Sequence, residues 1–82
     1  MIYYEVGKKV VGYWGAMWPY SYGKMCEVDV ENMKFSVQWA DGSKYHGRIS
    51  DVFYEQVQAC GVGVYFASGD EPDHWFEKKD AA

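Results

Sequence analysis

The sequence predicts a mainly β domain, a small five-stranded barrel with a short helix before the last strand. Aromatic residues form 20% of the 82 residues and leucine is absent, which favours strands over a helical bundle. Several short segments alternate between apolar and polar residues, which is the period of a half-buried strand. Nine scattered glycines suit tight turns. A chain of this length forms one domain with a limited core.

The segment 34–49 predicts a β-hairpin. Apolar residues alternate along 34–39 and again along 44–49, and Asp41-Gly42 lies between the two runs. Asp-Gly in this context is the strongest short hairpin signal, because a type I′ turn requires a positive φ at both central residues. We therefore expect a type I′ turn here. One face of the hairpin should carry Phe35, Val37 and Trp39, followed by Tyr45, Gly47 and Ile49.

Three further strands are expected, at 9–14, 24–30 and 62–66. Gly12, in the middle of the first of these, predicts a β-bulge or a sharp bend. The segment 15–23 contains Pro19 and is expected to be a loop. The predicted inward-facing residues are Val10, Cys26, Val28, Val30, Phe35, Val37, Ile49, Val64 and Phe66.

Two segments leave alternatives open. Residues 1–6 have the composition of a strand and form either an edge strand or an N-terminal extension. In 50–60, Ser50 or Asp51 could cap a helix that ends at Gly61, but the apolar residues there also suit a strand. We favour one to three helical turns.

Charge divides the chain into a barrel domain, residues 1–68, and an acidic C-terminal tail, residues 69–82. The net charge is −4, of which the tail carries −3: five acidic residues against Lys78 and Lys79. Three aromatic residues at 74–76 either dock the tail back onto the domain or leave the end frayed. No basic stripe is evident, so nucleic acid is not an expected partner. Without a signal segment or an apolar run of membrane length, we expect a soluble, cytoplasmic protein with no membrane partner.

No motif for catalysis, metal binding or a cofactor is evident. Cys26 and Cys60 are too few for a tetrahedral zinc site, and neither His46 nor His74 has a metal-binding partner at a suitable spacing. There is no phosphate-binding loop and no nucleophile elbow. We therefore expect a protein that is not an enzyme and needs no metal or cofactor.

Aromatic residues supply the candidate binding site. Trp18, Tyr20 and Tyr22 crowd a loop that should lie on the surface, which points to a lid or a contact surface. Trp14 and Trp39 end their strands and should reach the rim of the barrel. In a leucine-free domain, however, large rings also have to fill the core. The candidate site residues are Trp14, Trp18, Tyr20, Tyr22, Trp39, Asp41 and Tyr45.

The strand order, the long aromatic first loop and the short second and third connections together resemble an SH3-like barrel, and most closely a Tudor-type domain. The matching stretch runs from Gly7 to Val52. It contains a first strand that ends in an aromatic residue and a strand that closes in aromatic-x-Asp-Gly, at 39–42. The resemblance implies an aromatic cage for methylated lysine or arginine, built from Trp14, Trp18 or Tyr22, Trp39 and Tyr45 with the Asp41 carboxylate.

Three hypotheses about function follow. The first is a non-catalytic binding module that recognises a protein or peptide partner through an aromatic-lined surface. The second is a small stand-alone inhibitor, such as a viral anti-defence protein of the phage type, that docks on a host protein. The third is an obligate homo-oligomer whose exposed aromatic residues are buried between copies, with any ligand site at the interface.

Overall fold

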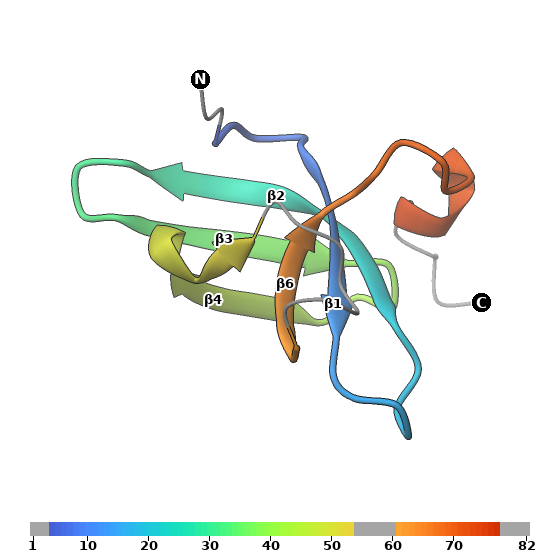
Figure 1. Cartoon of the computed structure of the whole chain (residues 1–82). Helices are drawn as coiled ribbons and strands as arrows, with labels where there is room; N and C mark the ends of the chain where they lie inside the picture. Colours follow the sequence, from blue (N-terminus) through green and yellow to red (C-terminus); the bar gives the residue numbers. More distant parts are fainter. Residues whose placement is uncertain (1–3, 54–60, 78–82) are drawn as a thin grey trace.

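Six strands form one curled sheet, shown in Figure 1. The computed structural model describes residues 4–53 and 61–77. The order across the sheet is β4-β3-β2-β1-β6-β5, and every neighbouring pair is antiparallel except β5 with β6. The strands are β1 (Lys9–Tyr13), β2 (Ser21–Asp29), β3 (Lys34–Trp39), β4 (Lys44–Arg48), β5 (Val52–Phe53) and β6 (Gly63–Phe66).

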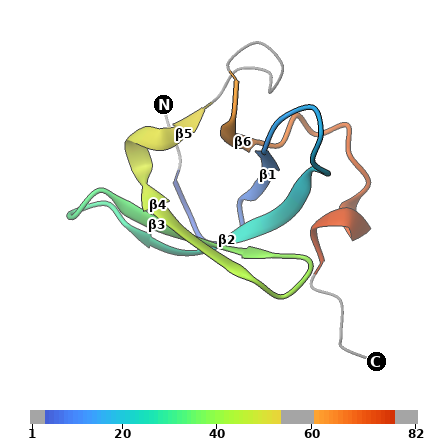
Figure 2. The same cartoon turned by 90° about the horizontal axis from the view of Figure 1, so that it is seen from below.

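The sheet curls into a half-barrel, which Figure 2 shows most clearly. The predicted mainly β class is confirmed, with five antiparallel strands close to their expected positions and the two-residue β5 in addition. The shape is compatible with an SH3-like barrel. Among the described residues, no helix is long and apolar enough to cross a membrane.

The predicted helix beginning at Ser50 or Asp51 is wrong at its start. One turn of 3-10 helix, η1 (Ile49–Asp51), begins earlier, and the chain is extended again at Val52, with φ −96° and ψ 126°. Val52 and Phe53 then pair with β6. A β-branched residue followed by an aromatic one favours the strand here. The rest of the predicted helix, 54–60, lies outside the described residues.

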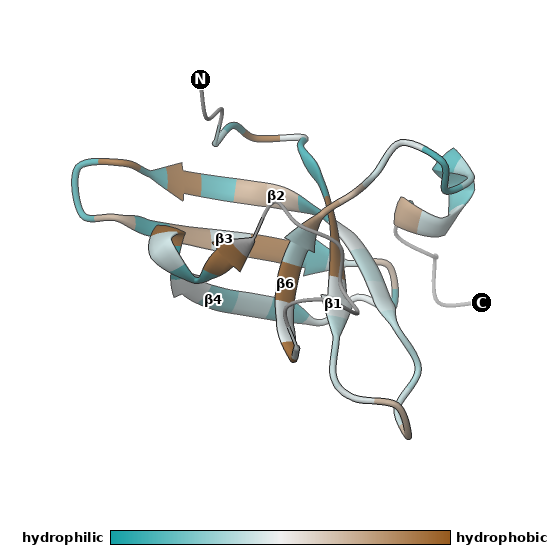
Figure 3. Ribbon diagram, in the orientation of Figure 1, coloured by the Kyte–Doolittle hydropathy of each residue, from teal (hydrophilic) through white to brown (hydrophobic). Residues whose placement is uncertain are grey.

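Almost every strand contributes buried residues to the core, and Figure 3 shows hydrophobic residues along β1, β2, β3 and β6. The buried members of the core are Val10, Met25, Phe35, Val37, Trp39, Ile49, Val52 and Val64. Five of the predicted inward residues are among them, and Val28 and Phe66 pack against the cluster while partly buried. The positions of Cys26 and Val30 are corrections to the prediction.

A β-bulge explains the position of Cys26, and the end of the strand explains that of Val30. The pairing of β2 with β3 shifts between Met25 and Glu27, which reverses the alternation so that Met25 is 1% exposed and Cys26 only partly buried. An extra residue in one strand moves every later side chain to the other face. Val30 lies beyond the end of β2 and is 61% exposed.

The β3–β4 hairpin forms where expected, but its turn differs. Lys34–Trp39 is the predicted strand, and β4 is one residue shorter than predicted. Gly42 has φ 97°, whereas Asp41 is not among the residues with positive φ, so the type I′ turn is wrong. The Gly42 amide donates to the Trp39 carbonyl at 3.0 Å, and the Trp39 amide donates to the Ser43 carbonyl at 2.9 Å. This pattern matches a three-residue loop that ends in a left-handed glycine.

Two predicted loops also change. The β1–β2 loop is shorter than 15–23, because β2 begins at Ser21 and includes Tyr22 and Gly23. Residues 4–6 form no strand, which favours the N-terminal extension over the edge strand for that described part. The Gly7 amide donates to the Met25 carbonyl and the Met25 amide to the Lys8 carbonyl, so this extension enters the sheet beside the bulge.

The tail segment after β6 returns to the sheet. A second 3-10 turn, η2 (Asp73–Phe76), lies against β2, and its Phe76 is 2% exposed. Of the two alternatives for the tail aromatics, docking onto the domain is therefore the one found. This contact places part of the acidic tail beside the first loop and the β3–β4 turn.

Candidate functional site

The structure divides the predicted site residues into two groups. Trp14, Trp39 and Tyr45 pack together with Phe35, and we call these four residues the inner aromatic cluster. Tyr20, Tyr22 and Asp41 line a separate groove on the outer face. Trp18 projects from the tip of the β1–β2 loop and is 67% exposed.

The inner aromatic cluster is part of the core. The Trp14 and Trp39 rings meet edge to face, with centroids 5.9 Å apart and planes at 84°. Tyr45 lies 6.1 Å from Trp14 and 6.3 Å from Trp39. The Trp14 Nε1 donates to Ser21 Oγ at 2.8 Å, and Trp39 is 4% exposed. Such edge-to-face packing adds to the area buried by the rings.

Two glycines make room for these indoles. A Cβ on Gly12 would lie 2.5 Å from Trp14 Cζ2 and 3.1 Å from Trp39 Cη2. A Cβ on Gly23 would lie 2.9 Å from Trp39 Cα and equally close to its ring. Because β1 pairs with β2 and β6 without a register shift, the bulge predicted at Gly12 is wrong. The glycine instead allows the Trp14 and Trp39 rings to approach the backbone of β1 closely.

The outer aromatic groove has a volume of about 500 Å³. Four parts of the chain form it: the end of the β1–β2 loop, the start of β2, the β3–β4 turn and η2. Trp39 borders it through the strand end that leads into the turn. The lining residues are Pro19, Tyr20, Ser21, Tyr22, Trp39, Ala40, Asp41, His74 and Trp75.

Aromatic rings run in a continuous series along the wall of this groove. Tyr20 lies 5.4 Å from Tyr13 and 6.4 Å from Tyr22, and Tyr22 lies 5.0 Å from Trp75. Tyr20 is 38% exposed and Trp75 41% exposed. At the loop tip, Met17 is 93% exposed. The rings are therefore held by their neighbours while they keep a large area open to solvent.

Asp41 supplies a fixed negative charge at the groove. Its Oδ1 accepts from the Ser43 amide at 2.9 Å and from Ser43 Oγ at 2.6 Å. These hydrogen bonds, the side-chain one first, lower the pKa of Asp41, so it is ionised at neutral pH. Burial, followed by the charges of Glu71 and Tyr20, raises the pKa of Tyr22, which therefore stays neutral. The groove combines neutral ring faces with one carboxylate.

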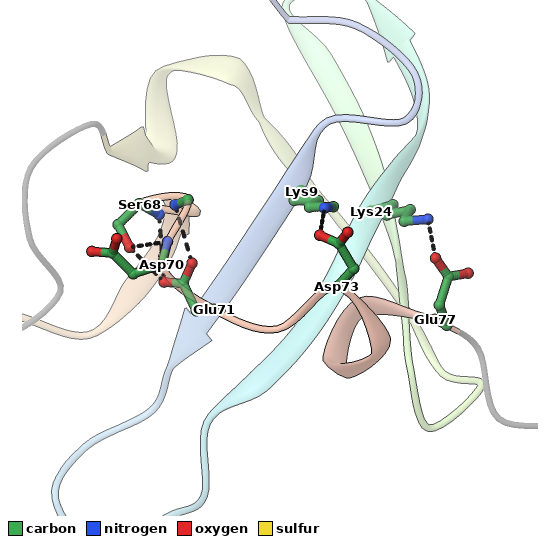
Figure 4. A network of polar contacts seen from close by, with 8 residues as sticks. Lys9, Lys24, Ser68, Asp70, Glu71, Asp73 and Glu77 are labelled. Carbon is green, nitrogen blue, oxygen red and sulfur yellow. Dashed lines mark hydrogen bonds and ion pairs between the residues drawn. The ribbon is translucent and has the colours of Figure 1, made fainter.

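The η2 wall is held by one buried ring and two ion pairs. Figure 4 shows Asp73 beside Lys9 of β1 and Glu77 beside Lys24 of β2. The Lys24–Glu77 pair is 2.7 Å long, and the Lys9 ammonium lies 5.6 Å from the centroid of the buried Phe76 ring. Upstream, the Glu71 carboxylate accepts from Ser68 Oγ at 2.9 Å, which fixes the turn that leads into η2.

Sequence reasoning missed five lining residues: Pro19, Ser21 and Ala40, which are chain neighbours of predicted site residues, and the distant pair His74 and Trp75. Both belong to the segment expected to be an acidic tail. The available signal was the cluster of aromatic residues at 74–76 inside a polar stretch, which raised docking as an alternative but did not indicate which face would receive it. A contact between segments more than 30 residues apart has no signature in local periodicity.

The other polar cluster on the sheet has a structural explanation. Ser36 and His46 are directly paired between β3 and β4, and Ser36 Oγ lies 2.7 Å from His46 Nδ1. In the described part of the chain, no group of three His, Cys, Asp or Glu residues could hold a metal ion. Comparison with protein-family models, with curated proteins and with solved structures finds no match to this chain.

Proposed function

We propose that this protein is a non-catalytic binding module that recognises a protein or peptide partner at the outer aromatic groove. The observation that carries the proposal is the groove itself: about 500 Å³, walled by Tyr20, Tyr22 and Trp75, with Asp41 at its edge. Partly exposed, well-supported aromatic residues are the side chains that dominate protein interfaces. A solvent-filled aromatic groove on a β domain suits an extended peptide.

The SH3-like and Tudor-like resemblance adds a finer proposal about the ligand. The implied cage drew on Trp14, Trp39 and Tyr45, which here contact one another in the inner aromatic cluster. The equivalent chemistry, ring faces beside a carboxylate, is present in the outer groove. A methylated lysine or arginine would be held there by Tyr22, Trp75 and Asp41 through cation–π attraction and charge.

Peptide selection tests the proposal. A random peptide library displayed on phage is selected on the wild-type protein, and each enriched peptide is then measured on Trp75→Ala and Tyr20→Ala. We expect peptides that lose at least about tenfold in affinity on both variants. The matched control is Val62→Ser, an exposed apolar residue away from the groove, which should bind like the wild type.

The same assay includes peptides that carry trimethyl-lysine or dimethyl-arginine beside their unmodified forms. A preference for the methylated forms that disappears in Asp41→Asn supports the finer proposal. No enriched peptides, or peptides that bind all variants equally, would contradict a groove-based function. If the enriched peptides show no preference for methylated forms, the proposal of a binding module stands and the proposal of a cage for methylated residues is rejected.

The exposed loop tip favours a second candidate, docking on one larger protein as a small inhibitor or assembly as an oligomer. Met17 and Trp18 expose 93% and 67% of their surfaces, and adjacent large apolar side chains of this kind mark interaction sites. Sedimentation separates the two forms: a mass above 9.5 kDa for one chain that falls in Met17→Ser/Trp18→Ser indicates the oligomer. A monomer that binds a single host protein through this tip indicates the inhibitor.

A further inference from the structure

Residues 73–77 dock on the outer face of β1 and β2, and their acidic and aromatic side chains complement the residues of that face. Lys9 and Lys24 are direct cross-strand partners on this face. Like charges in directly opposed positions destabilise a sheet. Here each lysine is neutralised by one acid from the docked segment, Lys9 by Asp73 and Lys24 by Glu77. The two lysines therefore form a site for a pair of carboxylates.

A buried aromatic ring, that of Phe76, docks on the same face beside Lys9. Phe76 is 2% exposed, and its ring lies 5.5 Å from Tyr22 in an edge-to-face arrangement. The Lys9 ammonium lies 5.6 Å from the same ring centroid, a cation–π distance. The face thus accepts an aromatic side chain that has a carboxylate three residues before it and another one residue after it.

Apart from the buried Phe76 ring, the contacts that hold the docked segment are weak. The side chains of Asp73 and Glu77 are 84% and 62% exposed. Exposed ion pairs contribute little to stability. The segment itself is a single 3-10 turn of four residues, Asp73–Phe76. A short element with one buried anchor belongs to the part of a structure that opens most readily.

We propose that this face of β1 and β2 is a second docking site, for an acidic-aromatic segment of a partner protein, and that residues 73–77 occupy it in cis. The partner segment would present an aromatic ring flanked by two carboxylates, as Asp73, Phe76 and Glu77 do. Charge complementarity with the paired lysines selects this occupant over an apolar or a basic one. The site is distinct from the outer aromatic groove, with which it shares Tyr22.

Competition is the main consequence. A tethered segment acts at an effective concentration in the millimolar range. The same segment supplied as a separate peptide therefore binds poorly to the wild-type chain, whose site is already filled. A chain whose own anchor ring has been removed leaves the site open. A partner segment with further contacts would displace residues 73–77, and Trp75 would leave the groove wall.

The experiment uses a fluorescein-labelled synthetic peptide with the sequence of residues 70–77 and the full-length chain. Binding is followed by anisotropy for the wild type and for Phe76→Ser. We expect at least about tenfold tighter binding to Phe76→Ser, because its own segment no longer fills the site. The triple variant Lys9→Glu/Lys24→Glu/Phe76→Ser should lose this binding, and a peptide with alanine in place of Phe76 should bind neither chain.

Two controls keep the outcome clear. Val62→Ser added to Phe76→Ser changes an exposed apolar residue that lines neither the groove nor this site, and it should leave the peptide affinity unchanged. If circular dichroism shows that Phe76→Ser is unfolded, Asp73→Lys/Phe76→Leu/Glu77→Lys weakens the anchor and repels both lysines while an apolar side chain still covers the sheet. That variant should then bind the peptide more tightly than the wild type.

Three results would overturn the proposal: no binding to either freed chain at millimolar peptide, equal binding to freed and wild-type chains, or binding that survives reversal of both lysine charges. Wild-type dimers that dissociate in Phe76→Ser would also overturn it as stated, because a second copy would then be the occupant rather than a partner protein.

Discussion

The inner aromatic cluster and the outer aromatic groove use the same residue types for different purposes. In the cluster, Trp39 is 4% exposed and its ring lies over the glycine backbones of β1 and β2. In the groove, Trp75 is 41% exposed and contacts Tyr22 at its side. The difference teaches why these two tryptophans differ: glycines on β1 and β2 let the Trp39 ring approach the backbone and become buried, whereas Trp75 packs against another ring and keeps part of its surface exposed.

The largest expected loss of stability comes from a mutation in the inner aromatic cluster. Trp39→Ala should lower the free energy of unfolding by about 3–5 kcal/mol, because it removes a buried ring that packs against the rings of Trp14 and Tyr45. Trp75→Ala should cost about 1 kcal/mol or less, because Trp75 is 41% exposed and lies outside the core. Urea denaturation measures both. Equal losses for the two variants would remove the distinction between cluster and groove.

The two glycines under the indoles should differ from each other. Gly23→Ala forces a Cβ against the backbone at Gln38 and Trp39, which cannot move without disturbing the β2–β3 pairing, so we expect a loss of about 2–3 kcal/mol. Gly12→Ala meets mainly the Trp14 ring, which can rotate, so the loss should be smaller. Thermal unfolding of both variants checks the order. A greater loss at Gly12 would contradict this account of the rings.

The hairpin turn should be less sensitive than either glycine in the strands. Gly42 has φ 97°, and an alanine there adopts a left-handed conformation that costs about 1–2 kcal/mol. Lys44→Ala, two residues away and exposed, is the matched control and should change stability by less than about 0.5 kcal/mol. Denaturant midpoints for the two variants provide the test, and a neutral Gly42→Ala would mean that the turn has relaxed.

The smallest expected effect concerns the η2 wall and depends on pH. The hydrogen bond and the charge of Lys9 lower the pKa of Asp73. A carboxyl whose folded-state pKa is lowered contributes stability above its unfolded pKa, about 3.9, and loses it as pH falls through the folded value. Docking of η2 should therefore be complete at neutral pH and weaken below about pH 4. The fluorine resonance of 5-fluorotryptophan at Trp75 reports this docking.

Asp73→Asn should remove most of this pH response, whereas Asp70→Asn should retain it, because Asp70 makes no ion pair to the sheet among the described contacts. A Trp75 resonance that titrates identically in both variants would show that another acid controls the wall.

Local alternation made most of the sheet predictable. The third strand, 34–39, and its hairpin partner could be located because each apolar residue there alternates with a polar one and Asp41-Gly42 separates the runs. The β2 register could not be predicted, because a bulge after Met25 leaves the composition of the strand unchanged while it reverses the faces. For Val52 and Phe53, local reasoning left helix and strand both open, and the pairing of these residues with β6 makes them a strand.

The candidate site was predictable only in part. Tyr20, Tyr22 and Asp41 line the groove as rim residues of the loop and the turn. Trp14 and Trp39 could not be assigned to the core from position alone, because their burial depends on close approach to Gly12 and, for Trp39, to Gly23 on the neighbouring strand. Trp75 and His74 enter through a contact between distant segments, which depends on the cross-strand pair of Lys9 and Lys24.

The most direct test of the division between cluster and groove measures the four tryptophans together. The protein is labelled with 5-fluorotryptophan, and each fluorine resonance is assigned by a Trp→Phe substitution. A soluble paramagnetic nitroxide then broadens the resonances in proportion to their exposure. We predict strong broadening for Trp18 and Trp75, weaker broadening for Trp14 and almost none for Trp39. A Trp39 resonance that broadens as much as that of Trp75 would contradict the account.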